Sequence, residues 1–341
     1  RKPFKVAHLF KLQGKDHSEI DAGVPGDICA VAKIDELMLD TVLHDSHDED
    51  DIRMQSVSYP SPMYGLAVTA RNRGDEQKIS DALQKLDVED PCFRVEHNSV
   101  TNETVIKGLG DLHLRVVLEK MNQRYNVEVD THTPKIEYRE TIRSSSEGHA
   151  RHKKQTGGAG QFARIKVNFE PLPAGSGFEF KNSVVGGSVP KEFIPGVEKG
   201  FRSAMDSGPL SGFPVIDLKA ELYDGDSHDV DSSVMAFEIA SRAAFREGIL
   251  KAGPALLEPI MRVEVVTPEE YMGDIIGDLN SRRGNVTSME QQGNARVVSA
   301  MVPLANMFGY VNTLRSQSQG RAQFTMHFDH YSEIPQSVSE E

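Results

Sequence analysis

Tryptophan, cysteine and long apolar runs are scarce or missing in this sequence of 341 residues. There is no Trp, so we expect no carbohydrate or aromatic-cage site built on one. The two cysteines, Cys29 and Cys92, lie far apart and outside any CxxC or Cys/His ligand spacing, which indicates neither a disulfide framework nor a zinc site. Such sparse cysteine is typical of a reducing cytoplasm. Because no run approaches about 18 apolar residues, no membrane-spanning helix is predicted.

Motifs for catalysis are also missing. A P-loop requires GxxxxGK followed by Ser or Thr, but the sole Gly-Lys pair, Gly14-Lys15, is followed by Asp16. The chain has no NKxD, G-x-S-x-G or HExxH run. A DxxG match at Asp274–Gly277 lies within a helical pattern, which favours a structural interpretation. We therefore predict no catalytic residue, no cofactor site and no metal site in this chain.

The chain is acidic overall. Its net charge of −13 argues against a protein that coats nucleic acid by charge alone, although local basic loops can still contact RNA. The acidic run His44–Asp51 has no apolar period and is interpreted as a solvated loop, because contiguous acids without a Gly-punctuated loop disfavour a calcium site. The chain begins with Arg1-Lys2-Pro3-Phe4-Lys5, not with Met or an apolar signal segment. We interpret this start as a cut within a longer protein.

Two stretches of the chain repeat one order of elements. In residues 59–133, strand-like runs alternate with helical stripes such as Ile79–Leu86, and the order reads β-α-β-β-α-β, the plan of ferredoxin-like domains. Residues 258–331 repeat this order. The segment between them, about 135–257, is predicted to be a third α/β unit with different spacing. Residues 1–43 alternate apolar and polar positions between Gly and Pro turns, which predicts a small β unit.

A basic run passes into a glycine-rich loop between His149 and Gln161. Lys and Arg neutralise phosphates, and Gly lets a backbone approach closely. The pattern fits an RNA-facing loop and, equally well, a plain hairpin turn with basic flanks. The candidate contacts are Arg151, Lys153, Lys154, Gln155, Gly157, Gly158, Gly160 and Gln161.

A second loop, Tyr223–Ser233, directly precedes a helical stretch, Val234–Leu250. Either Asp231 or Ser232 is expected to be the helix N-cap. The cap does not explain His228, which makes this His, with its neighbour Asp229, a candidate contact, although a lone His in a loop is usually only solvated.

Two predicted helices end with arginine and glycine. We expect Gly284 and Gly320 to occupy the C′ positions, with nearby cations complementing the helix dipoles. The arginines Arg282, Arg283 and Arg315 are also candidates for RNA contact.

Several runs resemble elongation factor G, in the same order and across nearly the whole chain. These runs are Leu86–Val95, Gly108–Leu114, Lys135–Ile142, Lys153–Gln161, Gly186–Pro190, Gly208–Leu210, Gly212–Val215, His228–Ser233, Leu257–Met261, Gly277–Leu279, Arg282–Gly284, Phe308–Tyr310 and Leu314–Ser316. Any one of them is weak evidence, but together they are specific.

The resemblance implies an α+β multidomain chain with four parts. Residues 1–56 would be the remnant of a β-barrel domain, and residues 57–133 and 258–341 two ferredoxin-like domains. Residues 134–257, between them, would be an α/β domain with a fold shared with a ribosomal protein. The GTPase domain of such a factor would lie outside this chain, and so would GTP and Mg2+. This chain alone would not be an enzyme.

The resemblance also implies a function and partners. In this family the fourth domain reaches the decoding centre of the ribosome during translocation, so its tips here would be Gln155–Gln161 and His228–Ser233. His228, with Asp229 beside it, would contact the tRNA–mRNA duplex. The third and fifth domains would contact rRNA, and the partners would be rRNA of both subunits and ribosomal proteins. The rRNA candidates are Arg151, Lys153 and Lys154 in the fourth domain and Arg282, Arg283 and Arg315 in the fifth. A cytoplasmic monomer without membrane contact is expected.

Departures from the family pattern favour an alternative. Pro60–Met63 stands where members commonly have an acid-Pro-Val run, and Ala159 and Phe162 stand where the better-known form has Arg and Tyr. These differences are consistent with an elongation factor G-like paralogue that acts in ribosome recycling or regulation, without strong translocase activity. A hydrolase that uses His228 and Asp231 as acid and base is disfavoured, because no nucleophile lies at a matching spacing.

Overall fold

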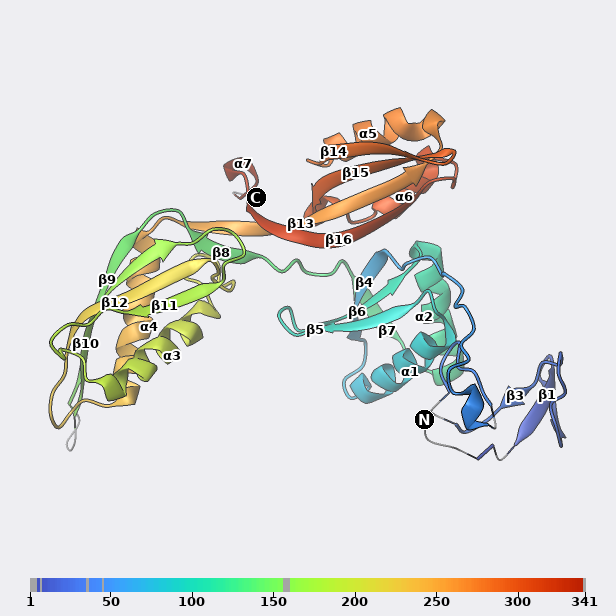
Figure 1. Cartoon of the computed structure of the whole chain (residues 1–341), viewed down its shortest axis with the longest axis horizontal. Coiled ribbons are helices and arrows are strands. Elements are labelled where there is room, and N and C mark those ends of the chain that lie inside the picture. The colour runs from blue at the N-terminus through green and yellow to red at the C-terminus, as the bar shows by residue number, and fades with distance from the viewer. Residues whose placement is uncertain (1–4, 7, 35–36, 45, 156–159, 340–341) are drawn as a thin grey trace.

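The computed structural model describes residues 5–6, 8–34, 37–44, 46–155 and 160–339, and within them the chain is α+β with four sheets (Figure 1). The first sheet is small and antiparallel, with the order β2-β1-β3. It consists of β1 (Leu9–Gln13), β2 (Asp16–Ile20) and β3 (Ala30–Val31), and Gly14 at φ 61 forms the turn from β1 to β2. Among the described residues this sheet stays open and does not close into a barrel. The acidic run contains one short 3-10 turn, η1 (His47–Glu49), capped by Ser46.

The second sheet belongs to the first βαββαβ unit, and its element order confirms the prediction. The elements are β4 (Tyr64–Ala70), α1 (Glu76–Glu89), β5 (Arg94–Asn98), β6 (Glu103–Gly108), α2 (Asp111–Tyr125) and β7 (Val129–His132). The strand order is β5-β6-β4-β7, so the first strand of the unit lies inside the sheet. The predicted helical stripe is buried, with Leu83 and Leu86 in one core with Leu114 and Met121 of α2.

The last sheet repeats this topology, with the order β14-β15-β13-β16. Its elements are β13 (Pro254–Thr267), η3 (Glu269–Tyr271), α5 (Met272–Ser281), β14 (Asn285–Gln292), β15 (Ala295–Pro303), η4 (Leu304–Asn306), α6 (Tyr310–Gln317), β16 (Gln323–Glu333) and α7 (Gln336–Ser339). The DxxG match lies inside α5, where Ile275 is fully buried, so the structural interpretation of that match is confirmed.

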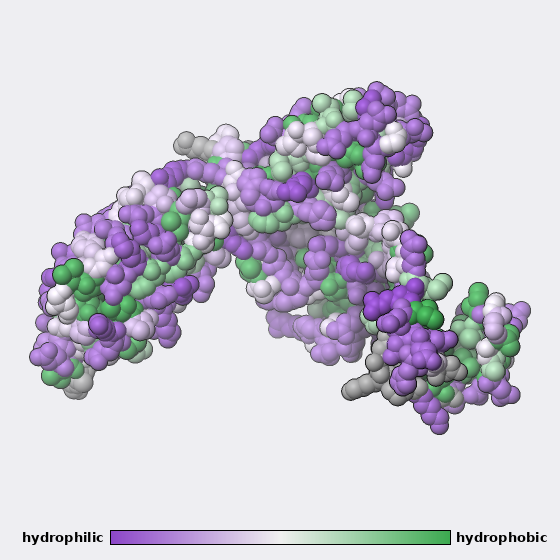
Figure 2. All heavy atoms as spheres, in the orientation of Figure 1, coloured by the Kyte–Doolittle hydropathy of each residue, from purple (hydrophilic) through white to green (hydrophobic). Residues whose placement is uncertain are grey.

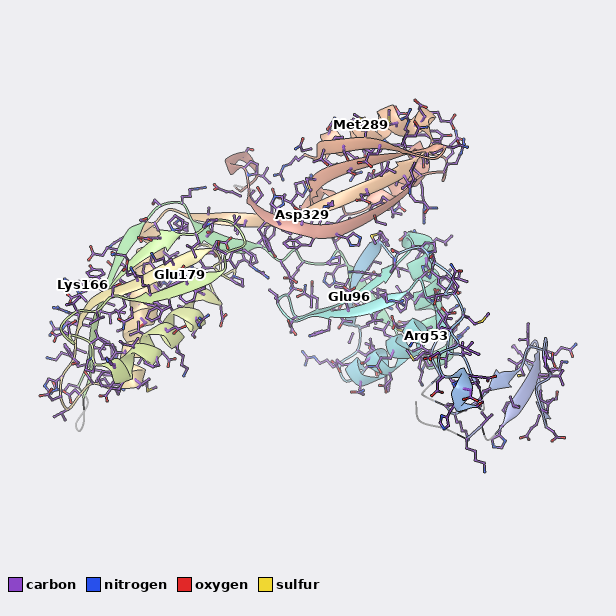
Figure 3. All side chains as sticks on the ribbon, viewed as in Figure 1. Arg53, Glu96, Lys166, Glu179, Met289 and Asp329 are labelled. Carbon is purple, nitrogen blue, oxygen red and sulfur yellow. The ribbon has the colours of Figure 1, made fainter. Side chains whose placement is uncertain are left out.

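The middle unit has a four-stranded sheet, β11-β12-β10-β9, in which only the β11–β12 pair is parallel. Its elements are β8 (Arg139–Ile142), β9 (Ser146–Lys154), β10 (Gln161–Pro171), β11 (Phe178–Asn182), η2 (Lys191–Phe193), α3 (Ile194–Met205), β12 (Leu218–Asp226) and α4 (Val234–Lys251). Phe169 of β10 packs edge-on against Phe201 of α3 and Phe245 of α4, so both helices cover one face of the sheet. The opposite face carries polar side chains such as Lys166 and Glu179, both labelled in Figure 3.

One long strand joins the middle unit to the last sheet. The first residues of β13, Pro254–Leu257, pair with β8, and the rest of β13 pairs with β15 and β16. This strand therefore runs through the position where the sequence places a domain boundary, between residues 257 and 258. An ion pair between Arg143 and Glu333 lies beside the junction. The two parts are thus connected by a continuous hydrogen-bonded ladder and not by a free linker.

Candidate nucleic-acid interface

The β9–β10 hairpin ends at the far end of the middle unit, away from the other three sheets (Figure 1). Its last register pair is Gln161 with Lys154, and the exposed Gln155 begins the turn. Two of the predicted loop contacts, Gly157 and Gly158, lie outside the described residues. A hairpin therefore forms at this position. Its backbone does not distinguish a plain turn from an RNA-facing loop, so the side chains around it are the relevant evidence.

Cations are exposed on the described part of this hairpin. Arg151, Lys153 and Lys154 are all exposed, and within the described ranges none of the three has a carboxylate oxygen within 4.0 Å. The Arg151 guanidinium lies over the ring of Phe162, 5.6 Å from its centroid. Between positions 134 and 257 sixteen Lys and Arg balance sixteen Asp and Glu, so the acidic excess of this chain lies in its other parts. The unit as a whole is therefore neutral, although the neighbouring loop adds the exposed carboxylates of Asp226 and Asp229 beside the hairpin cations.

The second candidate loop, between β12 and α4, packs directly against the hairpin. The Gly160 amide donates to Asp231 Oδ1 at 2.9 Å, and the Phe162 amide donates to the Asp231 carbonyl at 2.8 Å. The Ser232 hydroxyl donates to the Phe162 carbonyl at 2.8 Å. The structure thus joins two loops that are about seventy residues apart in the sequence and that carry separate motifs.

The predicted N-cap of α4 was wrong by one or two residues. The cap is Ser233, whose hydroxyl accepts a hydrogen bond from the Ala236 amide at 3.1 Å. Asp231 and Ser232 do not cap the helix, because both are engaged with the hairpin. The cap therefore leaves these two side chains free to join the loops.

His228 lies at the exposed surface of this second loop, with Asp229 exposed beside it. Its Nδ1 is 3.3 Å from the Val230 amide and 3.2 Å from the Asp231 amide, and both amides donate to it. Its ring meets Phe162 at an angle of 60° with centroids 6.3 Å apart. The ring is therefore held at Nδ1, and 56% of the side chain is exposed.

Both helices of the middle unit begin at this end. Gly196 near the start of α3 lies so close to Val234 at the start of α4 that a Cβ at Gly196 would be 2.7 Å from the Val234 carbonyl oxygen. Helix N-termini carry partial positive charge, which adds to that of the hairpin cations. Apolar side chains are exposed here too, with Val230 74% and Met235 63% accessible. Figure 2 shows hydrophilic and apolar residues mixed at this end.

The open sheet face behind the tip holds paired charges. Lys166 Nζ is 3.2 Å from Asp224 Oδ2, and this hydrogen bond lowers the pKa of Asp224. Burial and then the hydrogen bond to Glu147 raise the pKa of Tyr223 to about 12, which keeps its hydroxyl protonated as a donor. Because these side chains are paired with one another, this face has fewer unpaired charged groups to offer a partner than the hairpin tip has.

The three candidate arginines outside the middle unit all have intramolecular partners. Arg282 donates to Asp278 at 2.8 Å, to the Asn306 carbonyl at 2.7 Å and to Thr313 at 3.1 Å, and stacks over Tyr310. The guanidinium of Arg283 lies 2.5 Å from the almost fully buried Glu258, and Arg315 donates to the Leu109 carbonyl at 2.7 Å. Each arginine therefore binds another part of this chain, and its contact with rRNA stays a prediction.

The predicted C-caps were wrong in detail. Arg283, at φ 61, and Gln319, at φ 52, take the left-handed C′ positions. Gly284 and Gly320 follow as the next residues, and their amides donate back to Leu279 and Arg315. Gly284 is needed because a Cβ there would be 2.5 Å from the Leu279 carbonyl oxygen. Arg283 is tolerated at C′ because this position directs its side chain to Glu258.

Sequence reasoning missed the contacts that assemble the tip. Phe162 was noted only as a departure from a family pattern, and Asp231 only as a cap. No sequence signal linked Asp231 to the hairpin. Only the folded structure shows why position 160 is a glycine: a Cβ there would lie 2.9 Å from the Asp231 carboxylate. No group of three or more His, Cys, Asp or Glu side chains in the described ranges is placed to hold a metal ion. No helix in those ranges is long and apolar enough to cross a membrane.

Comparisons with known proteins agree with this architecture. Family models match residues 59–133 (Elongation Factor G, domain III), 134–253 (Elongation factor G, domain IV) and 255–341 (Elongation factor G C-terminus). Elongation factor G of Cereibacter sphaeroides is 52% identical over 99% of this chain and 48% of that protein. The Paracoccus denitrificans protein of the same name is 51% identical over 99% of this chain and 47% of its own length.

The chain belongs to the elongation factor G family. A crystal structure of a Thermus thermophilus protein is similar to it with a TM-score of 0.84 and 37% identity, over 98% of this chain and 50% of that one. The chain spans about half the length of the curated elongation factor G relatives it matches. The candidate tip lies in the unit that matches domain IV of elongation factor G. The predicted α+β fold class, with two ferredoxin-like units on either side of an α/β unit, is confirmed.

Proposed function

We propose that this chain is the ribosome-engaging part of a translational GTPase that promotes GTP-dependent translocation of tRNA and mRNA. GTP and Mg2+ would bind in a part of the longer factor that this chain does not include, and this chain would supply no bond chemistry. The factor would act in the cytoplasm as a monomer and contact rRNA of both subunits, ribosomal proteins and the tRNA–mRNA duplex. The domain division would be 1–56, 57–133, 134–257 and 258–341.

One observation supports this proposal most strongly, namely the joined tip of the middle unit. Two loops are hydrogen-bonded into one projecting end, with exposed cations on the hairpin and His228 on its surface. Cations beside closely approaching backbone are suited to phosphates and sugar edges of RNA. The contact residues we propose are Gln155, Gly157, Gly158, Gly160, Gln161, His228 and Asp229, with Arg151, Lys153 and Lys154 toward rRNA.

The mechanism would be steric. A ligand shifts an equilibrium between two states only by its difference in affinity for them. A projecting tip that fits the site vacated by tRNA would bind the post-translocation ribosome better than the pre-translocation one. It would thereby block return of the tRNA. The energy for repeated cycles would come from GTP hydrolysis in the other part of the factor.

The test is single-round translocation by the longer factor carrying His228→Ala. We expect translocation to slow by about tenfold or more, as for loss of about 1.4 kcal/mol of stabilisation, while ribosome-stimulated GTP hydrolysis stays near normal. The matched control is His97→Ala, which removes an exposed His from β5 in another unit. An unchanged translocation rate for His228→Ala would reject the role of this tip.

The recycling alternative needs its own assay. Subunit splitting measured beside peptide elongation separates the two functions on the same factor. Splitting without elongation would assign the protein to a paralogue and direct attention to Phe162 and to the run Pro60–Met63. Multi-cycle elongation would make those departures neutral variation.

A further inference from the structure

Contacts between the two loops of the tip fix the orientation of His228. We propose that Asp231 is the positioning residue of the tip: it joins the two loops and holds His228 with its proton on Nε2, so that the ring offers a partner a neutral hydrogen-bond donor. The inference rests on the proposed function, because it concerns the same tip. It specifies the partner chemistry as a hydrogen-bond acceptor on RNA, such as a base edge or a sugar hydroxyl, and not an ion pair with phosphate.

Hydrogen bonds to Nδ1 determine where the His228 ring carries its proton. The amides of Val230 and Asp231 both donate to His228 Nδ1, at 3.3 and 3.2 Å. A ring nitrogen that accepts a hydrogen bond carries no proton, so in the neutral imidazole the proton is on Nε2. Asp231 Oδ2 is also 3.7 Å from Nδ1, which would be an ion pair if Nδ1 were protonated. The two amides are closer and cannot reverse their direction, so the acceptor role of Nδ1 prevails.

Asp231 is fixed by hydrogen bonds to the β9–β10 hairpin. Its carboxylate accepts from the Gly160 amide and its carbonyl from the Phe162 amide, so one residue holds the start of β10 at two points. The neighbouring Ser232 hydroxyl accepts from the His228 amide at 2.8 Å and donates to the Phe162 carbonyl. With its backbone fixed in this way, Asp231 presents its own amide to His228. The hairpin therefore sets the geometry of the loop that carries the His.

The plane of the His228 ring is restricted by an aromatic neighbour. Phe162 lies against one side of His228, and Arg151 lies over Phe162. A ring packed on one side and hydrogen-bonded at Nδ1 has few rotamers left, which lowers the entropy lost when a partner binds. Nε2 has no hydrogen-bond partner among the described residues, and 56% of the side chain is exposed, so Nε2 is the nitrogen left for a partner. This arrangement differs from that of a freely rotating surface His, which would sample both tautomers.

A plain structural role for Asp231 is the competing interpretation. It would predict that any damage from its removal appears as lost folding stability. The spectroscopic test is therefore made on the 341-residue chain itself, labelled with 15N at histidine, at a pH of about 8 where free imidazole is uncharged. His228→Gln identifies the signal of this residue. We expect Nδ1 to show the shift of an unprotonated nitrogen and Nε2 that of a protonated one.

Variants then separate positioning from folding. Asp231→Ala should mix the tautomers of His228 while leaving the melting temperature of the chain nearly unchanged. Asp231→Asn keeps an acceptor oxygen for the Gly160 amide and should restore the single tautomer. Gly160→Ala introduces a Cβ at 2.9 Å from the carboxylate, and should mix the tautomers without removing any polar group. A protonated Nδ1 in the unmodified chain, or tautomers indifferent to Asp231→Ala, would overturn the proposal.

The functional arm uses the longer factor on ribosomes. We expect Asp231→Ala to slow translocation about tenfold with normal GTP hydrolysis, and Asp231→Asn to stay within about twofold of the unmodified factor. If His228→Ala is slow but Asp231→Ala is not, the proposed function stands and the positioning role fails. If both variants translocate normally while the spectra are as expected, the proposed function fails and the described geometry remains.

Discussion

At the scale of single residues, two buried carboxylates hold backbone amides in place, Glu103 in the unit at 59–133 and Glu140 in the middle unit. Glu140 is fully buried and accepts from the amides of Leu210, Ser211 and Phe213 at 2.7–3.1 Å. Glu103 is 7% exposed and is bonded to His132 and to the Lys135 amide, both at 2.9 Å. A buried carboxylate with several donors is costly to disturb, because the donors lose their partner together with the charge.

Glu103 leads to a prediction about pH. Burial by itself would raise its pKa, but the hydrogen bonds from His132 and the Lys135 amide outweigh burial, so the pKa lies below the ordinary value. A carboxyl with a lowered pKa stabilises the fold above its unfolded pKa of about 4.3, and this stabilisation is lost as pH falls through the folded pKa. We expect Glu103→Gln to cost about 1–3 kcal/mol at pH 7, and the difference from the unmodified chain to shrink below about pH 4.

Urea unfolding of both chains across this pH range measures the difference. The control is Glu264→Gln, which changes an exposed Glu on β13 and should have little effect at any pH. A Glu103→Gln cost that is the same at pH 3 and at pH 7 would show that the carboxylate charge has no part in the stability.

Residue roles were the hardest to predict from the sequence. Arg282 and Lys153 look alike in a sequence, as cations near glycine, but one is enclosed by four partners and the other is exposed. The difference comes from tertiary contacts with residues far along the chain, which spacing does not report. His228 could be singled out because no local rule explained it, whereas Asp231 fitted a capping rule and was misassigned for that reason.

At the scale of elements, close packing of α4 on β9 and β10 forms the core of the middle unit. Gly248 in α4 has no space for a side chain, since a Cβ there would lie 2.4 Å from ring atoms of Phe169. Gly277 in α5 is also helical, but apart from its chain neighbours and the backbone of its own helix, no described atom lies within 4 Å of the position of its Cβ. Packing therefore requires a glycine at position 248, whereas at position 277 there is space for a side chain.

Alanine at each position should have effects of opposite sign. We expect Gly248→Ala to destabilise the chain by about 1–3 kcal/mol, because overpacking exceeds the gain in helix propensity. Gly277→Ala should stabilise it by about 0.5–1 kcal/mol through that propensity alone. Calorimetric unfolding of the two variants measures both. Equal shifts of the same sign would mean that the approach of α4 to Phe169 is looser than described.

Helices and strands with a strong local period were predicted well from the sequence, whereas the pairing of strands between units was not. The βαββαβ order of the first and last units is confirmed, because the stripe Ile79–Leu86 and its counterparts have an unambiguous helical period. The pairing of β8 with Pro254–Leu257 could not be predicted, since it joins strands more than a hundred residues apart. Alternation shows that a strand exists but does not show which partner it has.

At the scale of the whole molecule, the units are connected to different degrees. The middle and last units share strand β13. The described contacts between the unit at 59–133 and the last unit include isolated hydrogen bonds, such as that from Arg315 to the Leu109 carbonyl. We expect Arg315→Ala to broaden the distance distribution between labels at Val116 and Met289, both exposed. The distribution between Leu250 and Met289, across the shared strand, should stay narrow.

Double electron–electron resonance on the full chain measures these distributions. The free thiols of Cys29 and Cys92 are first changed to Ser so that only the introduced labels report. Equal broadening of both distances in Arg315→Ala would contradict the picture of a rigid middle-to-last connection. No broadening in either would show that Arg315 does not restrain the first unit.

The most direct measurement is where the tip lies on the ribosome. A photo-crosslinking residue at Val230, which is 74% exposed beside His228, is placed in the longer factor, trapped on ribosomes with a non-hydrolysable GTP analogue and irradiated. The control carries the same group at Val88 on α1, which is 67% exposed. We expect crosslinks from position 230 to tRNA, mRNA or decoding-site rRNA, and none of these from position 88. Crosslinks from position 230 only to protein, or to the same RNA as from position 88, would contradict the assignment of this tip as the RNA-contacting site.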